Sequence, residues 1–120
     1  MKVLLVEDEP NIVEAVGFIL SRDGWTVASH ANGVTAMDEI RRVAPDVVVL
    51  DVMLPGRSGY DILRELRADA AFADLPVLML TARGQEKDRT VARDLGVSQF
   101  MTKPFSNTEL RDALRALRGG

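Results

Sequence analysis

The chain has 120 residues, of which 47% are hydrophobic and 28% are charged, with a formal net charge of −3 at pH 7, a single histidine (His30) and no cysteine. This size and composition are typical of one globular domain, expected to span residues 1–120, and the acidic balance argues against direct binding of DNA or RNA, whose protein partners are usually basic. Without cysteine, a zinc or iron–sulfur site is implausible, so a bound metal needs oxygen ligands.

The first apolar run, residues 3–6, is ended by Glu7 and Asp8. It is far too short for a signal-peptide core or a membrane span, so we expect a cytoplasmic protein that does not bind membranes. Further runs of strand length follow at residues 25–29, 47–50, 77–80 and 99–102. Most are continuously apolar, which is typical of strands buried on both faces of a parallel sheet. The run at 25–29 alternates more and predicts an edge strand.

Apolar residues recur at helical spacing between these runs, in the ranges 12–20, 36–43, 62–66, 86–95 and 110–117. The fourth range has only Val91, Ala92 and Leu95 as apolar anchors, so its helix should be the most weakly held. Residues typical of helix ends stand near the ends of these predicted helices. Pro10 suits a first helical turn, Gly24 and Gly96 suit helix C-terminal caps, and Ser106 and Glu109 have capping-box spacing.

Alternating strands and helices predict an α/β fold, a doubly wound five-stranded parallel sheet with helices on both faces. One common strand order for such a sheet is 2-1-3-4-5; the periodicity alone leaves another order, or a barrel, open.

In open α/β sheets, ligands bind beyond the carboxyl ends of the strands, where the strand order reverses. The residues at these ends are Glu7, Asp8, Asp51, Thr81 and Lys103. In the order 2-1-3-4-5, the three carboxylates converge, and at about 4 Å they would repel by roughly 4 kcal/mol per pair. A cation should relieve this repulsion, and all-oxygen ligation with few carboxylates suits Mg²⁺. Each residue alone is a weak signal; their joint placement is the strong one.

Four segments carry a resemblance to a known family: VEDEP at 6–10, VVLDVMLPG at 48–56 with Gly59 after it, LTAR at 80–83 and MTKPF at 101–105. They resemble the receiver domains of two-component response regulators, which have a flavodoxin-like fold, and the likeness covers essentially the whole chain. The resemblance implies a signalling switch that accepts a phosphoryl group from a sensor histidine kinase or a phosphotransfer protein. It implies a regulatory domain, which assists only its own phosphorylation and dephosphorylation, and not an enzyme.

The resemblance also assigns roles to single residues. Asp51 would be the phosphoacceptor. The Mg²⁺ ligands would be Glu7, Asp8, Asp51 and the backbone carbonyl of Met53. Lys103 would pair with a phosphoryl oxygen and Thr81 would donate its hydroxyl to another.

Further positions are implied to tune or transmit the signal. Phe100 would change rotamer when Thr81 moves toward the phosphoryl group, altering the face made by helix four, strand five and helix five. The small Ala82 would leave room for the phosphoryl group, while Met53 and Arg83 would modulate how fast it is lost. The Lys103–Pro104 bond would be cis.

The dimer interface used by the winged-helix transcription factors of this family is only partly present. Arg89 and Glu109 match it, whereas Ser98 and Gln99 replace acidic residues and Ala113 replaces a basic one. We therefore expect a monomer or a weak dimer. A C-terminal effector domain could follow this chain in a longer regulator, or the chain could act as a stand-alone receiver.

Three other functions fit parts of this pattern less well. A haloacid-dehalogenase-type phosphatase uses a second aspartate, two residues after its nucleophile, as the general acid. Met53 stands at that position here, so the leaving group would have no proton donor. A flavodoxin-like electron carrier needs a Ser/Thr-rich phosphate loop where Glu7 and Asp8 would repel phosphate. A degenerate module that works without phosphorylation would not need the intact set of site residues.

Overall fold

The computed structural model describes residues 1–82 and 84–119, and in these ranges five strands alternate with five helices. The strands are β1 (Lys2–Val6), β2 (Thr26–His30), β3 (Val47–Asp51), β4 (Val77–Thr81) and β5 (Gln99–Thr102). The helices are α1 (Pro10–Arg22), α2 (Ala36–Val43), α3 (Gly59–Ala68), α4 (Glu86–Asp94) and α5 (Asn107–Gly119). All strand pairs are parallel and their order is β2-β1-β3-β4-β5, which confirms the predicted fold and strand order.

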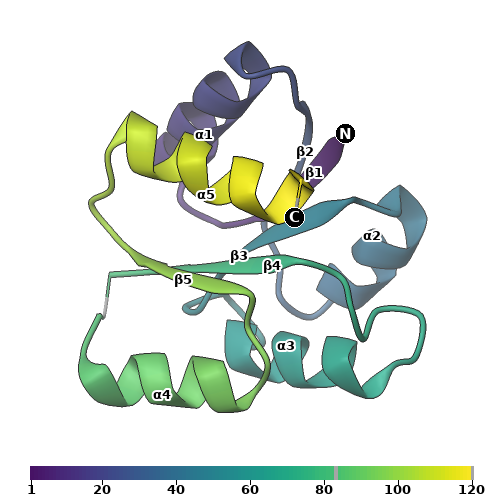
Figure 1. The fold of residues 1–120 in the computed structure, drawn as a ribbon. Helices are drawn as coiled ribbons and strands as arrows, with labels where there is room; N and C mark the ends of the chain where they lie inside the picture. The colour runs from purple at the N-terminus through teal and green to yellow at the C-terminus, as the bar shows by residue number, and fades with distance from the viewer. Residues whose placement is uncertain (83, 120) are drawn as a thin grey trace.

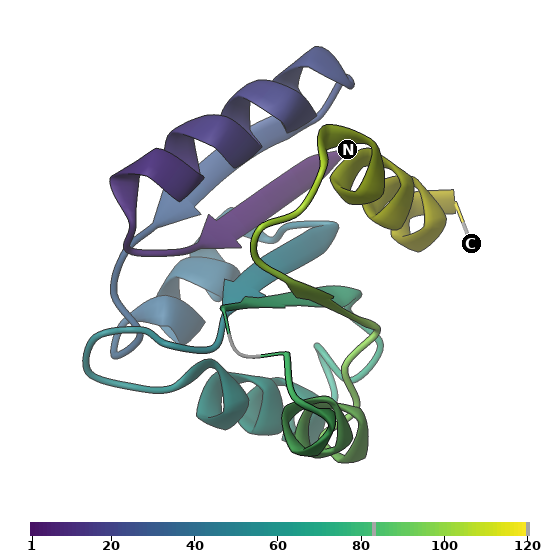
Figure 2. The ribbon, with the colours of Figure 1, turned by 90° about the vertical axis from the view of Figure 1, so that its left-hand side faces the viewer.

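Helices cover both faces of the sheet, with α1 and α5 on one face and α2, α3 and α4 on the other (Figures 1 and 2). Side chains alternate between the two faces along each strand. Leu5 and Leu78 therefore belong to the core under α1 and α5, while Leu4 and Met79 belong to the core under α2, α3 and α4. Burial on both sides explains why these strands are continuously apolar.

The strand register aligns the carboxyl ends at one edge of the sheet. Val6 of β1 lies opposite Leu50 of β3, and Thr81 of β4 lies opposite Thr102 of β5. Chemically active residues that follow or end these strands are therefore brought to the same edge.

Four strands differ from the prediction by one residue at one or both ends: β1 begins at Lys2 instead of residue 3, and β2, β3 and β4 differ as follows. Strands β3 and β4 each extend one residue further, so Asp51 and Thr81 are the last residues of their strands. Strand β2 is at the sheet edge, as predicted, but it begins at Thr26. Trp25, predicted to begin this strand, is instead a core residue on the face covered by α1 and α5.

Helix α4 is the most weakly held, as predicted, but with fewer anchors than expected. Among its described residues only Ala92 is buried, and Leu95 just beyond the helix packs partly against the core. The prediction that Val91 is an anchor was wrong, because its side chain is 43% exposed.

The predicted helix caps are present. Pro10 is the first residue of α1, and Gly24 and Gly96 have φ angles of 91° and 90° just after α1 and α4. Ser106 and Glu109 exchange hydrogen bonds of 3.1 and 3.0 Å at the start of α5, each side chain accepting from the other's backbone N–H. The described helices include none with the length and apolar character needed to cross a bilayer.

Candidate functional site

Three carboxylates meet at the carboxyl ends of β1 and β3, as the strand order predicts. Glu7, Asp8 and Asp51 each offer an oxygen within 4.8 Å of the others. Glu7 is fully buried and Asp51 is 2% exposed, whereas Asp8 is open to solvent. Because β1 and β3 are neighbours in the sheet, Asp8 and Asp51 come together although they are 43 positions apart in the sequence (51 − 8).

Glu7 is held by both backbone and side-chain donors. Its Oε2 accepts from the backbone N–H groups of Asp8 and Glu9 at 3.0 and 3.2 Å, and its Oε1 accepts from Lys103 Nζ at 2.7 Å. Burial, followed by the proximity of Asp51, raises the pKa of Glu7 above its ordinary value, although the Lys103 hydrogen bond opposes this. Glu7 is therefore harder to ionise here than in water.

Lys103 follows β5 and brings the positive charge to the site. Its Nζ lies 2.7 Å from Glu7, 3.3 Å from Glu9 and 3.5 Å from Asp51. Burial acts to lower the pKa of Lys103, but the hydrogen bond to Glu7 and the charges of Asp51 and Glu7 outweigh it, so this pKa is raised. The Lys103 N–H donates to Thr81 O at 2.8 Å, and the following peptide bond to Pro104 is cis, as predicted.

The backbone around Asp51 is tightly constrained. A Cβ on Gly59 would lie 2.2 Å from the Asp51 carbonyl oxygen, so only glycine allows α3 to begin this close to the end of β3. The Met53 N–H donates to Asp51 Oδ1 at 3.3 Å, and the Met53 side chain is 60% exposed.

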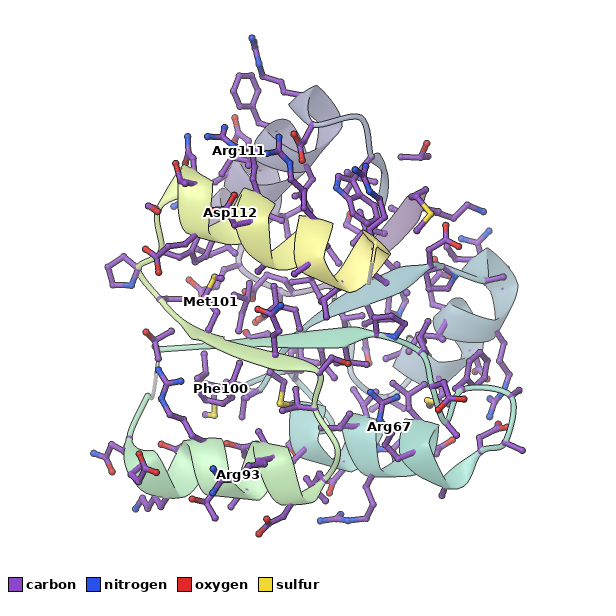
Figure 3. The ribbon with its side chains drawn as sticks, in the orientation of Figure 1. Arg67, Arg93, Phe100, Met101, Arg111 and Asp112 are labelled. Carbon is purple, nitrogen blue, oxygen red and sulfur yellow. The ribbon has the colours of Figure 1, made fainter. Side chains whose placement is uncertain are left out.

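Thr81 and Phe100 lie on the same face of the sheet. Thr81 is buried at the end of β4, and Phe100 sits opposite Met79, two residues earlier in that strand. Phe100 packs partly against the core under α4 and points toward that helix, while Met101 points toward α5 (Figure 3). Ala82 is exposed next to Thr81.

Arg83, expected to modulate loss of the phosphoryl group, lies outside the described residues.

Sequence reasoning missed two features of the site. The first is Glu9, which joins Lys103; its place beside Pro10, before the first helical turn, predicted only a helix start. The second is a cleft of ≈ 450 Å³ next to the carboxylates, which no local motif predicts because it forms between α1 and the end of β2. Its lining residues are Glu7, Asp8, Pro10, Val13, Glu14, Ser29, His30 and Ala31.

The donor set fits a small hard cation. All its side-chain donors are carboxylate oxygens, two of them held by the buried Glu7 and Asp51, while the exposed Asp8 leaves the site open to water. Mg²⁺ prefers oxygen ligands and keeps several waters, as this arrangement allows.

Comparison with known proteins agrees with the fold. The model of the response regulator receiver domain matches residues 3–115. The chain is 41% identical to the sensory transduction protein RegX3 of Mycobacterium tuberculosis over 98% of this chain and 52% of that protein. It is 38% identical to the phosphate regulon transcriptional regulatory protein PhoB of Escherichia coli K12, over 97% and 51% respectively. The chain thus spans about half the length of these curated relatives.

A solved structure shows the same architecture with a metal in place. The receiver domain of the sensor histidine kinase PA1611 from Pseudomonas aeruginosa PAO1, which has a magnesium ion coordinated in its active-site cleft, matches with a TM-score of 0.90 and 31% identity, covering 99% of this chain and 98% of that one. Since the family model matches nearly the whole chain and the strand order and acidic cluster agree with it, this chain belongs to the response regulator receiver domain family.

Proposed function

We propose that the chain is a phosphoacceptor switch, in which Asp51 takes a phosphoryl group from a sensor histidine kinase or a phosphotransfer protein in a Mg²⁺-dependent reaction. The observation that carries this proposal is the charge arrangement around Asp51. Its nearly buried carboxylate has two other carboxylates within 4.8 Å and the Lys103 ammonium at 3.5 Å. Such a crevice holds a nucleophile together with groups that can bind a cation and an anion.

In the transfer, an Asp51 carboxylate oxygen attacks phosphorus while the bond between phosphorus and the donor's imidazole nitrogen breaks. The electron pair of that bond stays on the donor nitrogen, and the product is an acyl phosphate on Asp51. Lys103 moves from its carboxylate partners toward a phosphoryl oxygen, and its charge stabilises the transferring group. Mg²⁺, held by Glu7, Asp8, Asp51 and the Met53 carbonyl, would supply the remaining neutralisation of the phosphoryl oxygens.

The signal then passes through the face formed by α4, β5 and α5. We propose that Thr81 donates its hydroxyl to the phosphoryl group, that the small Ala82 leaves room for it, and that Phe100 turns into the space Thr81 leaves. Support comes from their positions, because Thr81 and Phe100 share one face of the sheet and α4, which covers it, is weakly held. Met53 and Arg83 would set how fast the phosphoryl group is lost.

The output depends on a partner or a further domain. The relatives are about twice as long, and one is named as a transcriptional regulator, so a C-terminal effector domain that binds DNA is the proposed target of the switch. The chain itself has a net charge of −3, which favours a role without direct nucleic-acid contact. We propose that it works in the cytoplasm, where it would meet its kinase.

The experiment is phosphorylation by acetyl phosphate with and without Mg²⁺, read by mass spectrometry of the whole protein and of the peptide containing Asp51. We expect one added phosphoryl group that needs Mg²⁺ and is absent in Asp51→Asn. Asp46→Asn is the matched control, since this aspartate lies just before β3, away from the carboxyl end that carries Asp51. Undiminished modification of the same peptide in Asp51→Asn would overturn the proposal.

A further inference from the structure

The guanidinium of Arg89, on α4, lies over the ring of Phe100, on β5. The guanidinium carbon of Arg89 lies 5.0 Å from the centroid of the Phe100 ring, over its face. Figure 3 shows Phe100 lying between β5 and α4. This separation is within the range in which an arginine is attracted to the ring's quadrupole. Arg89 therefore contacts the side chain that the proposed switch must move.

The ring is the main partner of Arg89 in the described part of the chain. Within those residues, no carboxylate lies within 4.0 Å of the Arg89 guanidinium. In the described part of the chain, Ala92 is the one buried residue of α4, Leu95 just beyond the helix packs partly against the core, and the Tyr60 hydroxyl donates to the Asp88 carbonyl at 3.5 Å. Because α4 buries so little of its surface, a single side-chain contact can affect the position of this helix.

We propose that Arg89 is a positioning residue that holds Phe100 in the half-buried orientation seen here and so opposes the active state. This inference rests on the proposed function, and it adds the regulation of the same site. When the ring turns toward the space left by Thr81, its face is withdrawn from the guanidinium, and that attraction is lost. Arg89 thereby sets the resting fraction of molecules that are ready to accept the phosphoryl group.

The sign and size of the effect follow from linkage. An analogue that binds one conformation gains apparent affinity in proportion to the fraction of molecules already in that conformation. An exposed cation–π contact is weak, so its loss should raise that fraction about two- to five-fold. Arg89→Gln should therefore raise the apparent affinity for beryllofluoride with Mg²⁺ by about two- to five-fold, measured by NMR titration.

Arg93→Gln is the matched control. Arg93 lies one turn further along α4, and its guanidinium contacts the Thr90 hydroxyl at 3.4 Å, so this change removes the same charge without touching Phe100 (Figure 3). Loss of a cation alone should weaken the binding of an anionic analogue, which is the opposite sign. We expect Arg93→Gln to show no gain, and an equal gain in both variants would overturn the proposal.

A double-mutant cycle tests whether Arg89 acts through the ring. In the Phe100→Leu background, Arg89→Gln should no longer raise the affinity, because the aromatic face is gone. A gain of the same size there would overturn the proposal.

The contact can also be measured without any phosphoryl analogue. The side-chain protons of Arg89 should be shifted upfield by the Phe100 ring current, and this shift should vanish in Phe100→Leu. If the unmodified protein binds beryllofluoride but Arg89→Gln changes nothing, the inference fails while the proposed function stands. If no variant binds beryllofluoride, the proposed function fails and the regulatory role falls with it, while the upfield shift reports on the contact alone.

Discussion

Lys103 lies closer to Glu7 than to Asp51: its Nζ is 2.7 Å from Glu7 Oε1 and 3.5 Å from Asp51 Oδ2. The lysine that is proposed to bind the phosphoryl group is thus held mainly by a buried carboxylate of the three-carboxylate cluster. Lys103 offsets the charge of Glu7, while Asp8 and Asp51 add further negative charge to the same crevice. Because the pKa of Glu7 is raised in the folded protein, the stability of the metal-free protein should depend on pH.

Glu7→Gln should stabilise the metal-free protein at neutral pH. The folded-state pKa of Glu7 is raised above its ordinary value of 4.5, chiefly by burial, so ionising Glu7 costs more in the folded state than in the unfolded state. Its contribution to stability is complete below pH 4.5 and is lost as pH rises through the folded-state pKa. The gain from Glu7→Gln should therefore appear above this window and disappear below it, in thermal melts with EDTA.

The matched control for this change is Glu14→Gln, which removes an exposed carboxylate from α1 outside the three-carboxylate cluster. It should leave the pH dependence unchanged. A Glu7→Gln variant that is less stable than the parent at neutral pH would show that the Lys103 contact outweighs burial.

Mg²⁺ should raise the melting temperature, because a ligand that binds only the folded state stabilises it by mass action. Asp51→Asn should stabilise the metal-free protein by about 1 to 3 kcal/mol, since it removes one of the converging charges, and should also reduce the Mg²⁺ effect. Calorimetry with Mg²⁺ and with EDTA measures both. A melting temperature that neither metal nor mutation moves would mean that the carboxylates do not interact as their separation implies.

The sequence predicted the fold and the gathering of the site well, and for a physical reason. A parallel sheet buried on both faces needs continuous apolar strands, such as residues 47–50, and its strand order fixes which strand ends become neighbours. Once β1 and β3 are adjacent, Asp8 and Asp51 must converge. The strand ends were less certain, because Asp51 and Thr81 are polar and yet continue the hydrogen-bonded ladder by one residue.

Contacts that depend on side-chain packing could not be predicted. The approach of Glu9 to Lys103 joins residues 94 positions apart and leaves no periodic signal. Val91 is apolar and so was expected to anchor the helix, but its side chain is exposed. Its orientation depends on how α4 sits against the rest of the molecule, which the sequence does not specify. Trp25 follows a helix and precedes a strand, so its place in the core, not in the strand, becomes clear only once α1 and α5 are packed.

Arg115→Gln should destabilise the protein at neutral pH but not in strong acid. Arg115 Nε donates to Asp23 Oδ2 at 3.0 Å, and a second guanidinium nitrogen pairs with the other oxygen. The hydrogen bond from Arg115 lowers the pKa of Asp23 below its ordinary value of 3.8, although desolvation opposes it. The stability from this pair is present above pH 3.8 and is lost as pH falls through the folded-state pKa.

Urea unfolding of the parent and Arg115→Gln at a series of pH values measures this window. Arg93→Gln, which removes an arginine without a carboxylate partner among the described residues, should show no such dependence. A stability difference that persists unchanged at low pH would assign the effect of Arg115 to packing instead of charge.

Arg67→Met should lower the free energy of unfolding by about 1 to 3 kcal/mol, because it leaves partly buried carbonyl groups without their donor. The Arg67 guanidinium donates to the carbonyls of Gly96, Leu75 and Phe72 at 2.8, 2.8 and 3.1 Å, and burial lowers its pKa. It thus ties α3 to the turn between α4 and β5.

Arg64→Met is the control one turn earlier in α3, where the guanidinium pairs with exposed Asp61 at 2.9 Å. Such a surface pair contributes little, so this change should stay within about 0.5 kcal/mol of the parent in urea unfolding. Equal losses in the two variants would show that the carbonyl contacts of Arg67 carry no special weight.

Phosphorylation should produce little or no dimer through the face of α4, β5 and α5. Two of the positions that differ from the winged-helix branch are engaged within the chain: the Ser98 hydroxyl accepts from Val77 N–H at 3.0 Å, and Gln99 Nε2 donates to Ala113 O at 3.3 Å. Neither side chain supplies a charge to a second copy. Arg89 and Glu109 remain, but exposed ion pairs contribute little on their own.

Sedimentation of the beryllofluoride-bound protein over a range of concentrations measures this directly, with the metal-free protein as the reference. We expect a monomer, or a dimer so weak that it dissociates on modest dilution, because an interface that has lost most of its charged pairs keeps little specificity for this orientation. Restoring the charges with Gln99→Asp and Ala113→Arg together should strengthen the dimer, whereas either change alone should not, since each adds a charge without its partner. A tight dimer of the unaltered chain that Glu109→Gln disrupts would contradict the argument, because it would mean that the two retained residues suffice to hold the copies together.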